Sequence, residues 1–223
     1  MTFKTLCIGS GGFKGIGMLA LLNNKYNNEL KHIENYIGSS IGAFLCFFLS
    51  LGLTPDELLL LVCTLDCFSI FNHRDSFRRL TQVIADDDLF TMTFEQLHRL
   101  TGKTLVVTTL TAQSATSVRD FETNYYSHMY RSDKVVVDAI CESMHILPTE
   151  SEIDGGYGDN FPFGYAKKHL TSPILGVYTI DKTGTRYLNI QTKYFDNLVK
   201  VLTFMEQYVL YMQMRLIEYE KQL

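Results

Sequence analysis

The stretch IENYIGSSIGAFLCFFLSL, residues 33–51, carries the pattern that decides the fold. It opens with a short strand candidate at residues 33–37, and residues 43–51 predict a strongly apolar helix. Between them, Gly38, Ser40 and Gly42 complete Gly-x-Ser-x-Gly, the pattern of a nucleophile elbow. Such a turn strains its central residue and lifts the hydroxyl out of the sheet, while the small flanking residues keep strand and helix from colliding. The stretch therefore predicts a strand–turn–helix unit with Ser40 as a candidate nucleophile.

A glycine-rich segment, GSGGFKG at residues 9–15, lies upstream between an apolar run at 3–8 and a helical pattern at 15–30. Successive glycines let the backbone turn sharply and present N–H groups to an anion, reinforced by the helix N-terminus behind them. Neither Gly-x-Gly-x-x-Gly nor Gly-x-x-x-x-Gly-Lys-[Ser/Thr] is completed, since Lys14 occupies the third glycine position after Gly9. Taken alone, this loop is open to two interpretations, an anion-binding loop and a tight structural turn.

A third segment, Asp154-Gly155-Gly156, lies far downstream and is followed by Asn160 and Pro162. An Asp in a glycine turn can be held by backbone N–H groups and still reach across to another loop. Taken alone, the segment is also compatible with an ordinary turn.

Strand and helix patterns alternate along the rest of the chain, which predicts an α/β fold with a largely parallel sheet. Further strands are predicted at residues 105–110, near 118–123 and at 174–180, and further helices start at Thr54 and Thr93 or span 133–144 and 162–170. We expect one domain over residues 1–223, with a motif-bearing core at about 3–180. A C-terminal helix at about 195–222 is expected to pack its apolar face on the sheet.

Composition excludes several classes of protein. With 223 residues, 46% of them hydrophobic, the chain can build one substantial core and is not largely disordered. Twenty basic and 24 acidic residues give a net charge of −4, and the basic residues form no stripe, so we expect no nucleic-acid partner. The longest apolar stretch, residues 41–53, is shorter than the roughly 20 residues of a spanning helix.

The five cysteines are odd in number and no signal peptide precedes them, which predicts reduced thiols in a soluble, cytoplasmic protein. Cys63, Cys67 and His73 do not match a zinc spacing. We therefore expect neither a metal nor a cofactor.

In combination, the glycine-rich loop, Gly-x-Ser-x-Gly and Asp-Gly-Gly, in this order, resemble the patatin-like phospholipase family of lipid acyl hydrolases. The resemblance runs from about residue 3 to 168. It includes residues 135–143, similar to the family's helix before its aspartate, and the Asp-Gly-Gly-x-x-x-Asn-x-Pro stretch. It implies a three-layer fold in which helices flank a mainly parallel central sheet.

The resemblance also implies roles for individual residues. Ser40 would attack an ester carbonyl, and Asp154 would accept the serine proton and return it to the leaving alcohol. Gly11 and Gly12 would form the oxyanion hole, and Lys14 would meet a lipid phosphate. The remaining motif positions are the elbow glycines Gly38 and Gly42 and the downstream glycines Gly155 and Gly156.

These roles predict a metal-independent hydrolase of phospholipase A or esterase type that acts on lipid or phospholipid and contacts membrane surfaces transiently. Two alternatives stay open. One is a Ser–Asp–His triad that uses His169. The other is an inactive lipid- or partner-binding protein on the same fold, suggested by Ser10 in place of the family's first glycine and by a short segment between Ser143 and Asp154. The sequence does not indicate an oligomeric state.

Overall fold

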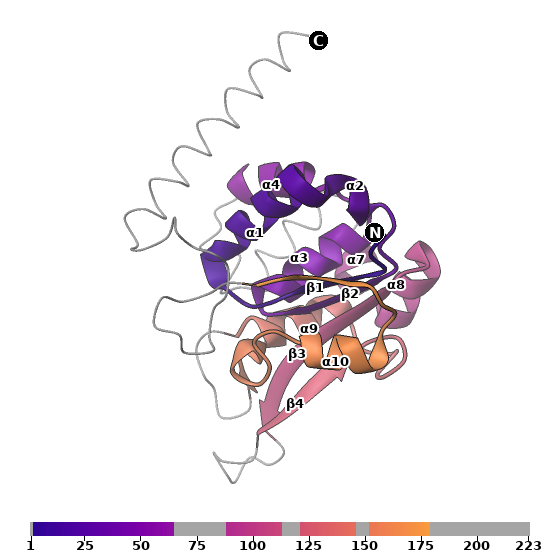
Figure 1. Cartoon of the computed structure of the whole chain (residues 1–223). Helices are drawn as coiled ribbons and strands as arrows, with labels where there is room; N and C mark the ends of the chain where they lie inside the picture. The colour runs from indigo at the N-terminus through magenta and orange to yellow at the C-terminus, as the bar shows by residue number, and fades with distance from the viewer. Residues whose placement is uncertain (1, 65–87, 113–120, 146–151, 179–223) are drawn as a thin grey trace.

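A computed structural model describes residues 2–64, 88–112, 121–145 and 152–178 (Figure 1). The predicted C-terminal helix at 195–222 lies outside these residues, as do Cys67 and His73. Residues 118–120 and 179–180 of two predicted strands also lie outside them.

The six strands form one sheet in the order β4-β3-β2-β1-β6, with β5 paired to β3. Their bounds are β1 (Thr5–Ile8), β2 (Asn35–Ser39), β3 (Thr104–Ala112), β4 (Phe121–Tyr126), β5 (Glu152–Ile153) and β6 (Ile174–Val177). The neighbours among β3, β2, β1 and β6 are parallel, whereas β4 and β5 are antiparallel to β3. The sheet is therefore mainly parallel, as predicted.

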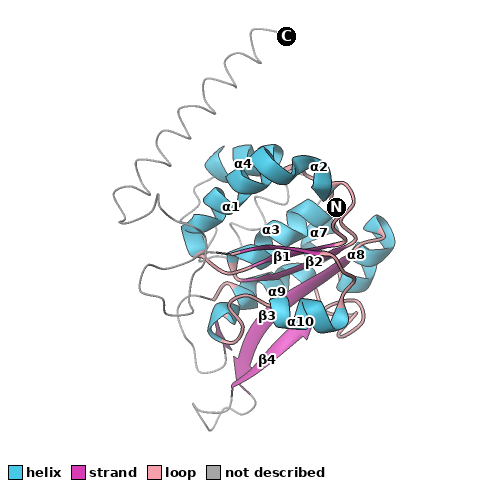
Figure 2. Cartoon of the chain, viewed as in Figure 1, coloured by secondary structure: helices cyan, strands magenta, loops and turns pink. Residues whose placement is uncertain are grey.

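Helices cover this sheet (Figure 2). The α-helices are α1 (Gly15–Leu21), α2 (Asn27–Leu30), α3 (Ile41–Ser50), α4 (Pro55–Thr64), α7 (Asp88–Thr91), α8 (Phe94–Thr101), α9 (Val136–Ser143) and α10 (Phe163–His169). The described residues also form two 3₁₀ turns, η1 (Gly12–Lys14) and η3 (Gly155–Tyr157), and one π-helical turn, η2 (Leu22–Tyr26). The helix predicted over residues 15–30 is thus present, with a π-helical turn between α1 and α2.

Side chains of the strands alternate between two cores because successive residues of a strand point to opposite faces. On one face, strand residues join the apolar faces of α1, α3, α4 and α9 in the large core: Leu6, Ile8, Tyr36, Leu105 and Val107. On the other face, Cys7, Ile37 and Val106 pack against Ala166 of α10. Figure 1 shows α3 and α4 on one side of the sheet and α10 on the other, which is the expected three-layer arrangement.

Local sequence explains where two helices begin. At the start of α4, Thr54 Oγ1 accepts from the backbone N–H of Glu57, whose carboxylate accepts from Thr54 N. Thr93 and Gln96 form the same reciprocal capping box at the start of α8. Each pair satisfies N–H groups that have no partner within the helix, so both predicted helix starts are confirmed.

Helix α3 is buried along its whole length. Its Phe44, Phe47 and Phe48 are at most 1% exposed, and the Phe44 and Phe48 rings lie 4.8 Å apart. These aromatic side chains therefore belong to the core and not to a lipid-facing surface. Within the described residues, no helix has the length and apolar character needed to cross a membrane.

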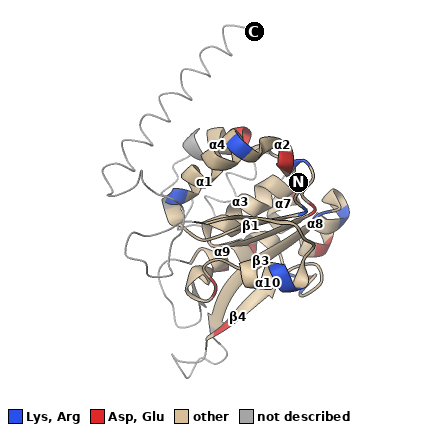
Figure 3. Ribbon diagram, in the orientation of Figure 1, with Lys and Arg blue, Asp and Glu red and all other residues tan. Residues whose placement is uncertain are grey.

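Charged side chains are dispersed over separate elements of the described chain (Figure 3). Cys7, Cys46 and Cys141 are free thiols, and the first two are buried. Burial raises the pKa of the Cys46 thiol well above its ordinary value, so this thiol stays protonated.

Candidate active site

Ser40 lies at the turn between β2 and α3, the position predicted for a nucleophile elbow. Its φ of 53° and ψ of −126° are unusual for a residue with a side chain, because the positive φ is strained for all residues except glycine. The residue is 7% exposed. The fold therefore holds the Ser40 hydroxyl at a strained, nearly buried turn.

The elbow is sharp enough to require glycine at both flanking positions. A Cβ atom at Gly38 would lie 2.3 Å from the carbonyl oxygen of Gly42. A Cβ atom at Gly42 would lie 2.2 Å from the carbonyl oxygen of Ile8 at the end of β1. Any side chain at either position would push α3 away from the sheet and displace Ser40.

Asp154 reaches the elbow from the far end of the described chain. Strand β5 pairs Ile153 with Leu110 of β3, which places the next residue beside the carboxyl end of β2. Oδ2 of Asp154 accepts a hydrogen bond from Ser40 Oγ at 2.6 Å, and Oδ1 accepts one from the backbone N–H of Gly156 at 2.8 Å. The structure thus brings together the two residues that the motifs single out.

The surroundings of Asp154 make its carboxylate more basic. The side chain is buried, and this loss of hydration raises the pKa of Asp154 above its ordinary value of 3.8. The hydrogen bonds from Ser40 and Gly156 and the nearby His145 oppose this effect without cancelling it. A carboxylate with a raised pKa is a better proton acceptor.

Sequence reasoning missed Ser143, which supports the elbow from α9. Its hydroxyl accepts a hydrogen bond from the backbone N–H of Ser40 at 2.8 Å and donates one to the carbonyl oxygen of Thr108 at 2.5 Å. Ser143 is fully buried. The available signal was its position at the end of the 135–143 segment, but a lone serine on an apolar helix does not reveal what it contacts.

The glycine-rich loop lies against the elbow. A Cβ atom at Gly15, just after the loop, would lie 2.5 Å from Cγ1 of Ile41, the residue next to Ser40. Gly12 has a φ of 54°, which favours glycine. Among the described atoms, the backbone N–H groups of Gly11 and Gly12 have no acceptor, so both are free to donate to a bound anion.

Ser10 links this loop to the aspartate loop. Its backbone N–H donates to the carbonyl oxygen of Asn160 at 2.8 Å, and its hydroxyl donates to the side-chain carbonyl of the same residue. A Cβ atom at Gly156 would lie 2.7 Å from Ser10 Oγ and 2.9 Å from Asp154 Oδ1. The serine that replaces a family glycine is therefore in close contact with the turn that carries Asp154.

Two further candidate residues are Lys14 and His169. Lys14 ends η1, and its ammonium group forms no ion pair within the described part of the chain. His169 lies at the end of α10 with its ring 4.5 Å from that of Tyr165, and no hydrogen bond joins it to Asp154. The residues described include no group of three side chains suited to a metal ion. Among the described residues, the Ser40 hydroxyl therefore forms a hydrogen bond with Asp154 and none with His169.

Comparisons with known proteins agree with this architecture. The profile of the patatin-like phospholipase family matches residues 6–167. The chain is 26% identical over 193 aligned residues to the probable lipid hydrolase 463L of Invertebrate iridescent virus 6, covering 75% of this chain and 64% of that protein. The chain thus spans just under two thirds of the length of this relative.

The fold of this chain was also compared with solved structures. The structure of VipD from Legionella pneumophila aligns with a TM-score of 0.53 and 14% identity, covering 73% of this chain and 47% of VipD. The structure of the type III effector ExoU aligns with a TM-score of 0.47 and 13% identity, covering 61% of this chain and 38% of ExoU. Because the family profile spans well over half of its residues, this chain belongs to the patatin-like phospholipase family.

Proposed function

We propose that this protein is a lipid acyl hydrolase that cleaves carboxylic esters through a dyad of Ser40 and Asp154. The observation that carries the proposal is the 2.6 Å hydrogen bond from Ser40 Oγ to Asp154 Oδ2 at a strained elbow. Membership of the patatin-like phospholipase family and similarity to a viral protein named a probable lipid hydrolase support the same activity.

In the first half of the reaction, Ser40 Oγ attacks the acyl carbonyl carbon while its proton moves to Asp154 Oδ2. The N–H groups of Gly11 and Gly12, which have no acceptor among the described residues, are the proposed donors to the negative oxygen of the tetrahedral intermediate. Collapse of this intermediate breaks the ester bond, and Asp154 returns the proton to the leaving alcohol. An acyl group is left on Ser40.

In the second half, water replaces the alcohol. Asp154 accepts a proton from the attacking water, the acyl–oxygen bond to Ser40 breaks, and the serine recovers its proton from Asp154. A carboxylate serves as the base in both halves because its burial raises its pKa, and no imidazole is required.

The substrate we propose is a membrane lipid or phospholipid, so the protein contacts membrane surfaces while it turns over. Lys14 lies two positions after Gly12, the second proposed oxyanion donor, and its ammonium group lacks an acidic partner among the described residues. It is therefore placed to meet the phosphate of a phospholipid.

The decisive experiment compares the full chain with Ser40→Ala on p-nitrophenyl butyrate and on phosphatidylcholine vesicles. We expect the wild type to release nitrophenol and fatty acid and to react with a fluorophosphonate probe at Ser40. The Ser40→Ala variant should do neither. Ser50→Ala is the matched control because it removes another buried serine hydroxyl, bonded to the carbonyl of Phe47.

The alternative of an inactive binding protein gives a different result. Such a protein would bind the vesicles, leave both substrates intact and fail to react with the probe at Ser40. Loss of labelling in Ser50→Ala together with Ser40→Ala would also contradict the proposal, because it would trace the effect to general damage of α3.

A further inference from the structure

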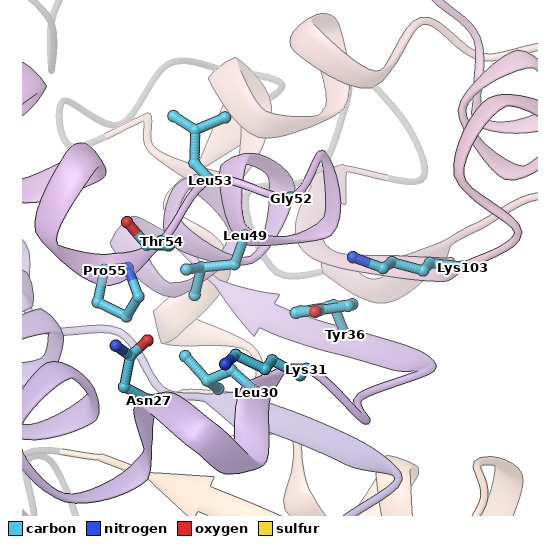
Figure 4. A pocket seen from close by; sticks show the side chains of 10 residues that line it. All are labelled: Asn27, Leu30, Lys31, Tyr36, Leu49, Gly52, Leu53, Thr54, Pro55 and Lys103. Carbon is cyan, nitrogen blue, oxygen red and sulfur yellow. The ribbon is translucent and has the colours of Figure 1, made fainter.

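A second recess lies at the opposite end of β2 from the catalytic pair. It is a cavity of about 110 Å³ between α2, the loop that joins α3 to α4, and the residue before β3 (Figure 4). Its polar lining residues are Asn27, Lys31, Tyr36 and Lys103. No carboxylate belongs to its described lining, so the cavity presents hydrogen-bond donors and positive charge.

Tyr36 contributes a hydroxyl without a partner. The residue is 1% exposed, and no described group forms a hydrogen bond with its hydroxyl. Tyr36 lines the cavity, so a ligand bound there can accept a hydrogen bond from this hydroxyl. Burial also raises the pKa of Tyr36, so at neutral pH the hydroxyl retains its proton and can donate it.

Two ammonium groups border the same space without acidic partners. Neither Lys31 nor Lys103 forms an ion pair with a described residue, and the Lys103 ammonium lies 5.4 Å from the centre of the Tyr36 ring. Partial burial lowers the pKa of Lys103, which shows that its charge is incompletely hydrated. A bound anion would compensate for that loss.

Two acids close to lining residues in the chain have partners of their own. Glu34 pairs with Lys4, and Glu57 accepts hydrogen bonds from the backbone N–H and the hydroxyl of Thr54. Glu29 and Asp56 adjoin lining residues in the sequence but do not line the cavity, so its described charged lining consists of Lys31 and Lys103.

The other lining residues of the cavity are mostly apolar, and the volume of the cavity limits the size of a ligand. Leu30, Leu49, Leu53 and Pro55 line it. An apolar cavity of roughly 150 Å³ accommodates benzene, so one of about 110 Å³ has room for a body of only a few carbon atoms. An inorganic anion would leave the apolar wall uncovered, and a long acyl chain is larger than the volume of the cavity.

We propose that this cavity binds a short-chain carboxylate, with the carboxylate held by Lys103, Lys31 and the Tyr36 hydroxyl and the carbon chain against the leucines and Pro55. The site is separate from the dyad. Ser40 lies four positions after Tyr36 along the chain, about 13 Å at the rise of a strand. Binding therefore does not depend on the proposed hydrolysis.

The test is a calorimetric titration of the full chain with pentanoate, with pentanamide as the neutral analogue and inorganic phosphate as the simple anion. We expect saturable binding of pentanoate and much weaker binding of the other two. Lys103→Met should weaken pentanoate binding about tenfold, since a charge-assisted hydrogen bond is lost, and Tyr36→Phe should weaken it severalfold. Lys168→Met on α10 should leave binding unchanged.

Controls distinguish binding at this cavity from effects of the catalytic serine and from unfolding of the variants. Ser40→Ala should bind pentanoate as the wild type does, whether or not the chain is a hydrolase. Melting curves establish that Lys103→Met and Tyr36→Phe are folded, and Tyr36→Phe alters only one hydroxyl. The proposal is overturned if pentanoate does not bind, if Lys103→Met and Tyr36→Phe bind it unchanged, or if pentanamide or phosphate binds as tightly.

Discussion

Ser40 Oγ donates a hydrogen bond to Asp154 Oδ2 at 2.6 Å, although 114 residues separate the two in the sequence. Both partners are held at a cost in stability. Ser40 has a positive φ, and Asp154 is a buried carboxylate whose pKa is raised by burial. Groups held in unfavourable states are typical of catalytic sites, where stability is exchanged for reactivity.

We predict that Asp154→Asn abolishes turnover and stabilises the fold at neutral pH. Asparagine keeps the size of the side chain but cannot accept the serine proton, so kcat should fall at least about 10²-fold. Because the folded pKa of Asp154 lies above its ordinary value of 3.8, the native carboxyl contributes stability at low pH that is lost as pH rises through the folded pKa. Asparagine does not ionise, so the Asp154→Asn variant does not lose this stability as pH rises.

Urea unfolding at pH 7 and the pH profile of kcat/KM test these two statements. The wild-type profile should lose activity on the acid side at a pH above 3.8, because protonated Asp154 cannot act as a base. If Asp154→Asn is less stable than the wild type, or if it retains turnover, the role assigned to Asp154 is wrong.

Ser143→Ala should reduce kcat with little change in KM. The substitution removes the acceptor of the Ser40 N–H and the donor to the Thr108 carbonyl, so the strained elbow loses its side-chain support. We expect a stability loss of about 1–3 kcal/mol, typical of a buried hydrogen-bonding group left without its partner. Steady-state kinetics and thermal unfolding measure the two effects.

Ser50→Ala provides the comparison for Ser143→Ala. It removes a buried hydroxyl that is bonded to the Phe47 carbonyl away from the elbow, so stability should fall while kcat is preserved. Equal losses of kcat in both variants would show that Ser143 acts only through general stability.

Gly156→Ala should impair activity, and Ser10→Gly should partly restore it in the double variant. The added methyl group would lie 2.7 Å from Ser10 Oγ and 3.0 Å from Ser10 Cβ, as well as 2.9 Å from Asp154 Oδ1. Ser10→Gly removes the first two contacts. A double-mutant cycle on kcat/KM should give a coupling energy of about 0.5–3 kcal/mol, and additive effects would contradict the contact.

Lys14→Met should raise KM for phospholipid vesicles and leave hydrolysis of p-nitrophenyl butyrate nearly unchanged. Only the first substrate carries a phosphate that the ammonium group can meet. Lys167→Met on α10 is the matched control, since it removes one lysine charge from another element. Equal effects of Lys14→Met on both substrates would instead indicate a change in the glycine-rich loop itself.

His128 should make the fold less stable as pH falls below about 6.5. Its ring stacks on His98 at 3.8 Å, and burial, followed by the effect of His98, lowers the pKa of His128, while Glu95 opposes this. Since the unfolded chain then binds the proton more readily than the folded chain, protonation favours unfolding. Unfolding midpoints measured from pH 7.5 to 5.5 should decline more steeply in the wild type than in His128→Gln, and parallel curves would contradict the prediction.

Much of the local structure could be predicted because local causes produce it. The short apolar run of β1, the glycines around Ser40 and the capping pairs at Thr54 and Thr93 each act over a few residues. Asp154 was indicated only by the order of the three motifs and the family resemblance that they carry, because Asp-Gly-Gly alone is compatible with an ordinary turn. Such local patterns can be recognised in a single sequence because strand pleating, helix capping and tight turns each require particular residues at fixed spacing.

Contacts between distant segments needed the tertiary structure. The support of Ser40 by Ser143, the link from Ser10 to Asn160 and the contact of the His169 ring with Tyr165 all depend on how the loops, α9 and α10 pack against the sheet. The sequence by itself determined which short segments form turns, strands or helices, because these conformations depend on neighbouring residues. Only the packing of the whole core decided which side chains meet, because burial of apolar surface is non-directional and an apolar pattern does not say which residues its face will contact.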